Sequence, residues 1–387
     1  MADINLTYGF NNNTSCLCQS VATYIILPTL YSLMFLTGVP GNILSLWVFM
    51  TMIPDKTPTH IHLINLGMSN LVLCLTMPFQ AAYYSMGTVW DTSHPVCKIA
   101  VSFLTPMLHT NIAVGMTSLT WVALSRCAIL VQHTNARRPS RITYILPSIF
   151  LRQLCRTRFA WVLCLGTWGL MLAFIVPAMV TYSMAVSQAE VRESCYSARV
   201  EVGRSEFAMA VVILGLVIFF LCYLLVLSSY MAVTRHIFRI RSGTAISDRQ
   251  RIYARVLRNI VVIQAVLTVC LLPHHIYRAI FIDMVHKYPM SAPPPAGCHP
   301  LSVHVEVKNM LLSLAVLRCS VDPITYFLLD RTFRKHTVSL LGLTTPSKSS
   351  QPSVDSGGVA LRVYKVQTEN SMMTQCAELG KDNLTVE

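Results

Sequence analysis

The sequence predicts an all-α membrane protein, a bundle of seven transmembrane helices with its N-terminus outside the cell. Three observations lead to this fold class. Of the 387 residues, 53% are hydrophobic and only 12% are charged, whereas soluble domains carry roughly 25% charged residues. Long apolar segments recur along the chain, and Lys and Arg collect between alternate pairs of them. A set of soluble domains and a largely disordered chain are both excluded by this composition.

The apolar segments predict the spans directly. Six of them lack charged residues over the roughly 18 or more positions that a helix needs to cross a bilayer. By number they are 24–50, 57–90, 99–125, 159–189, 207–234 and 259–277. A seventh, 309–329, is interrupted by Arg318 and Asp322. Charges inside a membrane are costly and usually serve function, so we predict that this segment is both a span and a candidate site.

The distribution of basic residues predicts the orientation. Six arginines fall between 137 and 158, seven between 235 and 258, and seven more Lys or Arg follow residue 330. On the opposite side the basic residues clear of the spans are Arg192, Arg199, Arg204 and Lys287. Basic loops stay in the cytoplasm, so the N-terminus is extracellular and the protein crosses the cell membrane several times. The cytoplasmic loops account for the net charge of +13, so we do not expect a nucleic-acid partner.

Four regions follow from this layout. They are an extracellular glycosylated N-terminus (1–23), the seven-transmembrane domain (24–330), a membrane-surface helix (331–341) and a disordered cytoplasmic tail (342–387). The predicted glycosylation sites are the sequons at Asn5, Asn12 and Asn13. The segment after residue 330 is basic and amphipathic, which predicts contact with membrane lipids. The tail is polar and poor in large apolar residues.

Short motifs stand at definite places in the spans. They are Gly41-Asn42, Ser125-Arg126-Cys127, Trp168, Cys270-Leu-Leu-Pro273 and Asp322-Pro-Ile-Thr-Tyr326. Together, from about residue 24 to 341, they resemble the motifs of class A (rhodopsin-like) G-protein-coupled receptors. Pro273-His-His275-Ile-Tyr-Arg278 and Lys308 further resemble the branch of purinergic and lysophospholipid receptors.

The resemblance implies a receptor that transmits an extracellular signal to heterotrimeric G proteins, not an enzyme, with neither cofactor nor metal. Arg126 is the residue expected to meet the G protein, and Tyr230, Tyr326 and Pro273 belong to the activation machinery. Where the family usually has an acidic partner for this arginine, the chain has Ser125. The alternatives are a constitutively active or non-signalling seven-helix receptor and, more remotely, a multi-pass transporter.

Cations near the outer ends of the sixth and seventh spans predict the ligand class. Arg278 and Lys308, with His274 and His275 close by, would bind the phosphate or carboxylate of an anionic ligand such as a nucleotide or lysophospholipid. The alternative is that the two cations reach toward lipid headgroups or pair with Glu306 or Asp283.

A polar network is predicted in the bundle interior, built from Asn42, Asn70, Arg318 and Asp322. Asn70 stands where the family usually has an aspartate that helps to bind sodium, and Asp322 stands where asparagine is usual. Arg318 precedes Asp322 by four residues, so the two can form an ion pair on one helix face. The guanidinium then replaces the sodium ion, or the pair is purely structural.

The cysteines predict covalent links outside the cell. The resemblance implies a disulfide between Cys97 and Cys195. Cys298 could pair with Cys16 or Cys18 and so tie the N-terminus across the mouth of the pocket, but the sequence does not fix this connectivity.

Overall fold

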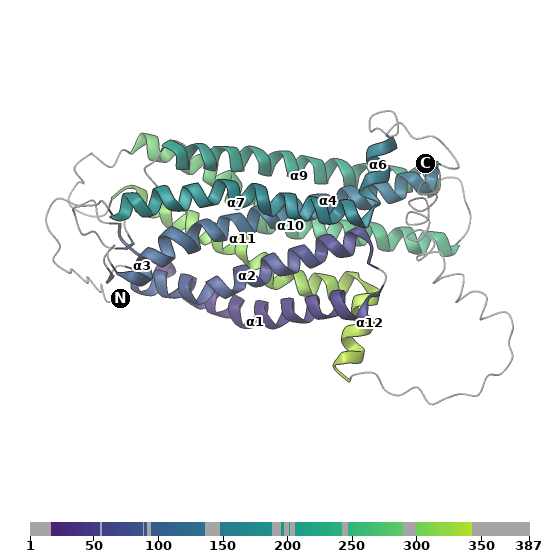
Figure 1. Cartoon of the computed structure of the whole chain (residues 1–387), viewed down its shortest axis with the longest axis horizontal. Helices are drawn as coiled ribbons and strands as arrows, with labels where there is room; N and C mark the ends of the chain where they lie inside the picture. The colour runs from purple at the N-terminus through teal and green to yellow at the C-terminus, as the bar shows by residue number, and fades with distance from the viewer. Residues whose placement is uncertain are drawn as a thin grey trace.

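Among the described residues, seven long helices lie side by side in the computed structural model (Figure 1). The structure describes residues 17–54, 56–87, 89–90, 94–135, 148–187, 195–196, 201, 206–241, 247–288 and 299–342, and no strand occurs among them. The long helices are α1 (Leu27–Trp47), α2 (Pro58–Met86), α4 (Thr105–Asn135), α7 (Thr157–Ser187), α9 (Glu206–Arg241), α10 (Ser247–Lys287) and α11 (Leu301–Leu329). The predicted all-α class is confirmed.

Shorter helical pieces extend or join these seven. The π-helical segments η1 (Ala22–Ile26) and η2 (Val48–Met52) lengthen α1 at its two ends. The short helix α3 (Pro95–Ile99) and η3 (Ala100–Leu104) lead into α4. The remaining two are α6 (Ser148–Leu154), before α7, and α12 (Arg331–Leu340), after α11.

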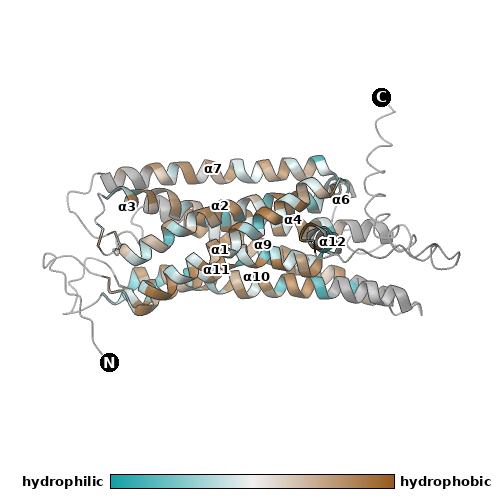
Figure 2. Ribbon diagram, turned by 90° about the horizontal axis from the view of Figure 1, so that it is seen from below, coloured by the Kyte–Doolittle hydropathy of each residue, from teal (hydrophilic) through white to brown (hydrophobic). Residues whose placement is uncertain are grey.

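Apolar side chains on the outside of the bundle indicate a lipid environment. Trp47, Leu165 and Leu224 are each more than half exposed. Figure 2 shows hydrophobic residues along the middle of the long helices. Six stretches of the described chain are long and apolar enough to cross a membrane: Ala22–Met52, Pro58–Met86, Thr157–Pro177, Met209–Arg235, Arg258–Lys287 and Leu301–Leu329.

The third long helix, α4, is not among those six stretches, and it carries polar residues that are bonded to α2 inside the bundle. Ser69 Oγ of α2 donates to Asn111 Oδ1 of α4 at 2.9 Å. Asn65 Nδ2 of α2 donates to Ser118 Oγ of α4, also at 2.9 Å. Polar groups inside a bilayer need such partners, and these bonds fix α4 against α2.

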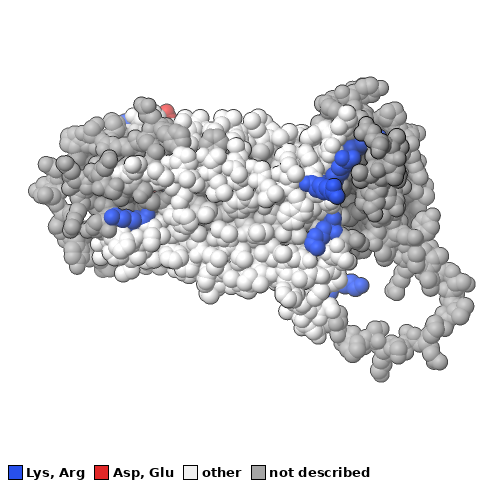
Figure 3. Space-filling model, in the orientation of Figure 1, with Lys and Arg blue, Asp and Glu red and all other residues white. Residues whose placement is uncertain are grey.

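One end of the bundle is basic. Figure 3 shows Lys and Arg gathered at the end where Figure 1 places α6 and α12. The exposed basic residues of this end are Arg152, Arg156, Arg158, Arg235, Arg258, Arg334 and Lys335. This is the distribution expected of a cytoplasmic face. The sequons at Asn5, Asn12 and Asn13 and the tail after residue 342 lie outside the described residues.

The short helix α12 begins at a side-chain cap. Asp330 Oδ1 accepts a hydrogen bond from the backbone N–H of Phe333 at 3.0 Å, which satisfies one of the free donors at the start of a helix. The ring of Phe333 packs against Phe49 at a centroid distance of 5.2 Å, and Tyr326 packs edge-on against Phe49 at 5.6 Å. The three rings attach α12 to η2 and to the cytoplasmic end of α11.

Candidate ligand cavity and signalling elements

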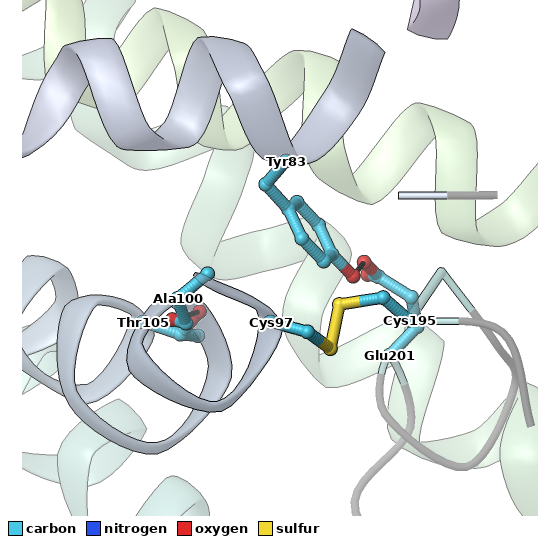
Figure 4. Close-up of a disulfide and its surroundings, with 6 residues drawn as sticks. All are labelled: Tyr83, Cys97, Ala100, Thr105, Cys195 and Glu201. Carbon is cyan, nitrogen blue, oxygen red and sulfur yellow. Dashed lines mark hydrogen bonds between the residues drawn. A yellow bond between two sulfur atoms is a disulfide. The ribbon is translucent and has the colours of Figure 1, made fainter. Parts of the chain in front are cut away.

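A disulfide fixes the loop between α7 and α9 to the outer end of the bundle. Cys97 and Cys195 are bonded, with their Cα atoms 5.8 Å apart, so the predicted pair is confirmed. The backbone N–H of Cys195 donates to the carbonyl of Trp90 at 2.7 Å, and that of Tyr196 donates to Gly87 at 2.8 Å. The loop is therefore held by both covalent and backbone contacts. Figure 4 shows this disulfide beside Tyr83 and Glu201.

Beneath this loop lies a cavity of about 210 Å³. Side chains of α2, α4, α9, α10 and α11 line it, together with one loop residue. Its polar lining includes Tyr83, His109, Glu201, His274, Arg278 and Lys308. An apolar cavity with a few converging polar groups is the usual form of a small-molecule site.

Arg278 lines the cavity as a cation without an acidic partner among the described residues. Its Nη1 donates to Nδ1 of His109 on α4 at 3.3 Å, which means that this ring nitrogen is the acceptor and His109 is neutral. The His109 ring stacks on His274 at 6.1 Å. A guanidinium held by neutral neighbours keeps its positive charge available to an anion.

The two adjacent histidines of α10 have different environments. His274 is 2% exposed and lines the cavity, and neither of its ring nitrogens has a hydrogen-bond partner in the described part of the chain. His275 donates through Nδ1 to the carbonyl of Leu271 at 2.9 Å, and its ring stacks on Phe219 at 3.5 Å. His274 thus lines the cavity and His275 does not, because neighbouring residues on a helix point about 100° apart. The predicted contact of His275 with a ligand stays a prediction.

Lys308 forms an ion pair with Glu201 of the loop. Its Nζ lies 2.8 Å from Glu201 Oε2. The predicted alternative, in which Lys308 pairs with Glu306 or Asp283, is wrong. Glu306 instead accepts a hydrogen bond from Thr23 Oγ1 at 3.0 Å. Burial by itself raises the pKa of Glu201, but the Lys308 cation and the hydrogen bonds to the carboxylate bring the pKa below its usual value. Glu201 is thus ionised at neutral pH.

The sequence did not reveal several residues of this cavity. Glu201 gives no signal of its own, since it is one acid in a loop whose approach to the helices depends on tertiary structure. His109 lies mid-segment in an apolar stretch. The signal that could have found it is its polarity within a span, which in a membrane predicts a functional or buried position.

Deeper in the bundle, the predicted polar network is assembled. Arg318 Nη1 bonds the carboxylate of Asp322, and Arg318 Nη2 donates to Asn70 Oδ1 at 3.2 Å. Asn70 Nδ2 donates to Asp322 Oδ2 at 2.8 Å. Arg318 is 1% exposed and Asp322 5%, so the pair is desolvated. Asn42 joins the network by accepting from Asn70 at 3.3 Å, which connects α1, α2 and α11.

Gly115 of α4 makes room for the Arg318 guanidinium. A Cβ at position 115 would collide with Nη2 and lie 3.0 Å from Cζ. We therefore expect Gly115→Ala to destabilise the protein by about 1–3 kcal/mol, the usual cost of overpacking a core. Thermal unfolding of the purified protein in detergent measures this. The matched control is Gly169→Ala on α7, whose Cβ would meet nothing within 4 Å. Equal unfolding midpoints for the two variants would contradict the close contact.

The residues expected to couple to a partner inside the cell lie at the basic end. Ser125 is fully buried, and its hydroxyl has no hydrogen-bond partner within the described residues. Arg126 is half-buried and forms no ion pair with any described residue. Tyr230 and Tyr326 are buried, and Pro273 lies within α10. The roles of these five residues stay predictions.

Of the cysteines in the second predicted extracellular disulfide, the structure describes one. Cys18 is disulfide-bonded, and its backbone N–H donates to Ser302 Oγ of α11 at 3.2 Å. Cys16 and Cys298 lie outside the described residues, so their pairing stays a prediction. In the described part of the chain, no three His, Cys, Asp or Glu side chains gather in a way that could hold a metal ion.

The bundle, the bonded loop and the cavity define a seven-transmembrane receptor. The family model described as 7 transmembrane receptor (rhodopsin family) matches residues 41–326, and the chain belongs to this family. It is a multi-pass protein of the cell membrane that transmits an extracellular signal. Membership of the family implies coupling to G proteins, which confirms the function predicted from the motifs.

Individual relatives narrow the resemblance. The chain is 35% identical over 342 residues to Probable G-protein coupled receptor 82 of Homo sapiens, covering 88% of this chain and 98% of that protein. It is 24% identical to Probable G-protein coupled receptor 34 of Mus musculus, covering 89% and 84%. It is also 24% identical to a purinoceptor of Mus musculus, covering 85% and 80%. These similarities agree with the predicted purinergic and lysophospholipid branch.

Proposed function

We propose that this receptor responds to an extracellular ligand that carries an anionic group and that Arg278 binds this group in the cavity. The receptor then passes the signal to heterotrimeric G proteins and catalyses no reaction. The observation that carries the proposal is Arg278 itself: a cavity-lining cation with a neutral histidine beside it and no acidic partner among the described residues. An arginine binds a phosphate or carboxylate through two parallel hydrogen bonds.

His274 supports the same proposal. A buried imidazole with neither nitrogen bonded costs about 1–3 kcal/mol, and it lines the cavity near Arg278. An acceptor on a ligand would satisfy its N–H. One relative is named a purinoceptor, and that name says that it binds purines. Nucleotides are therefore the first ligands to test, followed by lysophospholipids.

The basic end supports a role for lipids as partners. Arg334 and Lys335 are exposed on α12, while Phe333 on the same helix is buried against the bundle. A helix of this kind lies at the membrane surface with its cations near anionic headgroups.

The test is the loss of ligand response in Arg278→Gln. Nucleotides, lysophospholipids and their neutral esters are screened for G-protein activation in cells expressing the receptor. For any active compound we expect Arg278→Gln to lower the potency by about 30-fold or more, because one partner of a buried charge pair is removed. The control is Lys287→Gln, which removes a cation from the exposed outer end of the same helix. Equal potency in both variants, or activation by neutral esters, would contradict the proposal.

A further inference from the structure

We propose that the carboxylate of Glu201 is an internal anion that competes with the extracellular ligand for Lys308. This inference rests on the proposed function, because it assigns a second cation of the same cavity to the ligand's anionic group. Arg278 and Lys308 both line the cavity, and so does Glu201. At rest the cavity therefore offers one unneutralised cation, and displacement of Glu201 provides a second.

Glu201 is bound as a free carboxylate ligand would be. Oε2 accepts from Lys308 Nζ at 2.8 Å and from Asn309 Nδ2 at 3.2 Å. Oε1 accepts from the hydroxyl of Tyr83 at 2.6 Å (Figure 4). Lys308 also donates to the backbone carbonyl of Glu201 at 2.9 Å. Donors from α2 and α11 thus converge on a group that the loop, and not either helix, supplies, and its side chain is only 7% exposed.

The loop holds this carboxylate at a high local concentration. Glu201 follows the disulfide-bonded Cys195 by six residues and precedes the start of α9 at Glu206 by five. A group on a short tether has an effective concentration on the order of millimolar or above. An external anion that binds Lys308 has to displace the Glu201 carboxylate. An anion that binds Arg278 alone leaves this carboxylate in place.

This arrangement predicts the charge of the ligand. A ligand with a single anionic group can use Arg278 and leave the loop in place. A ligand with two or more adjacent negative charges, such as a diphosphate, gains the second cation only when Glu201 leaves Lys308. Binding of such a ligand is coupled to release of Glu201 from Tyr83 of α2 and from Lys308 and Asn309 of α11.

The test measures the binding affinity of the receptor for inorganic pyrophosphate, which serves as the probe. Binding to the purified full-length receptor is followed by its thermal midpoint at constant ionic strength, with sodium chloride as the reference salt. We expect Glu201→Gln to bind pyrophosphate about tenfold more tightly than the wild type. We expect the added substitution Lys308→Met to return the affinity to that of the wild type. Glu306→Gln, which removes a carboxylate that does not line the cavity, is the control and leaves the affinity unchanged.

The outcomes separate this inference from the proposed function. Unchanged or weaker binding in Glu201→Gln, together with loss of binding in Arg278→Gln, would overturn the competition alone. Binding that survives Arg278→Gln in every background would overturn the proposed anion site. If Glu201→Gln does not fold, the pair Glu201→Gln/Lys308→Met answers the same question. Affinity equal to the wild type supports the competition, and affinity tenfold weaker shows that Lys308 already binds external anions and overturns it.

Discussion

Asp322→Asn is expected to lower the stability of the receptor by about 3–5 kcal/mol, the cost of leaving a buried charge without its partner. Arg318 is almost completely buried, and Asp322 is the only acidic side chain that it contacts among the described residues. Thermal unfolding of the purified receptor measures the loss directly. We also expect a smaller fraction of the Asp322→Asn receptor than of the wild type to reach the cell surface.

The variant that removes both charges is the control. Arg318→Met together with Asp322→Asn replaces the buried pair by an apolar and a neutral polar side chain of similar size. Such replacements are often neutral or stabilising, so we expect this pair to unfold close to the wild type and well above Asp322→Asn alone. If the single and the paired substitution unfold at the same temperature, the loss of stability in Asp322→Asn does not come from an unpaired Arg318 charge.

Arg126→Ala is expected to abolish G-protein activation. In the family this arginine meets the G protein, and its usual acidic neighbour neutralises it at rest. Here Ser125 cannot neutralise a guanidinium, and no described residue takes over that role. The resting state therefore lacks one ion pair, and we expect the wild type to signal without ligand. The measurement is ligand-free G-protein activation in cells.

Much of the fold could be predicted because it depends on local properties of the chain. The length of the apolar segments gives the helices, and the basic loops give the orientation. The Arg318–Asp322 pair was also predictable, since residues four apart always lie on one face of a helix. The Cys97–Cys195 bond came from the family resemblance alone, because spacing does not reveal which cysteines meet.

The parts of the cavity that could not be predicted depend on how each helix is rotated about its axis and on the position of Glu201 relative to the helices. His274 and His275 are adjacent, and only the packing of α10 against Phe219 decides which of them faces the cavity. Glu201 reaches Lys308 across 107 positions of the chain, which no local pattern records. The sequence left Lys308 either available to the ligand or paired with Glu306 or Asp283, whereas the structure pairs it with Glu201.

Arg126 at the cytoplasmic end has no acidic partner among the described residues, so we expect the receptor to signal without ligand. Ligand-free activation of each G-protein family is compared between the wild type and Arg126→Ala at matched surface expression. We expect a basal signal in the wild type that disappears in Arg126→Ala. Equal signals from the two proteins across all G-protein families would contradict it and would favour a seven-helix receptor that does not signal.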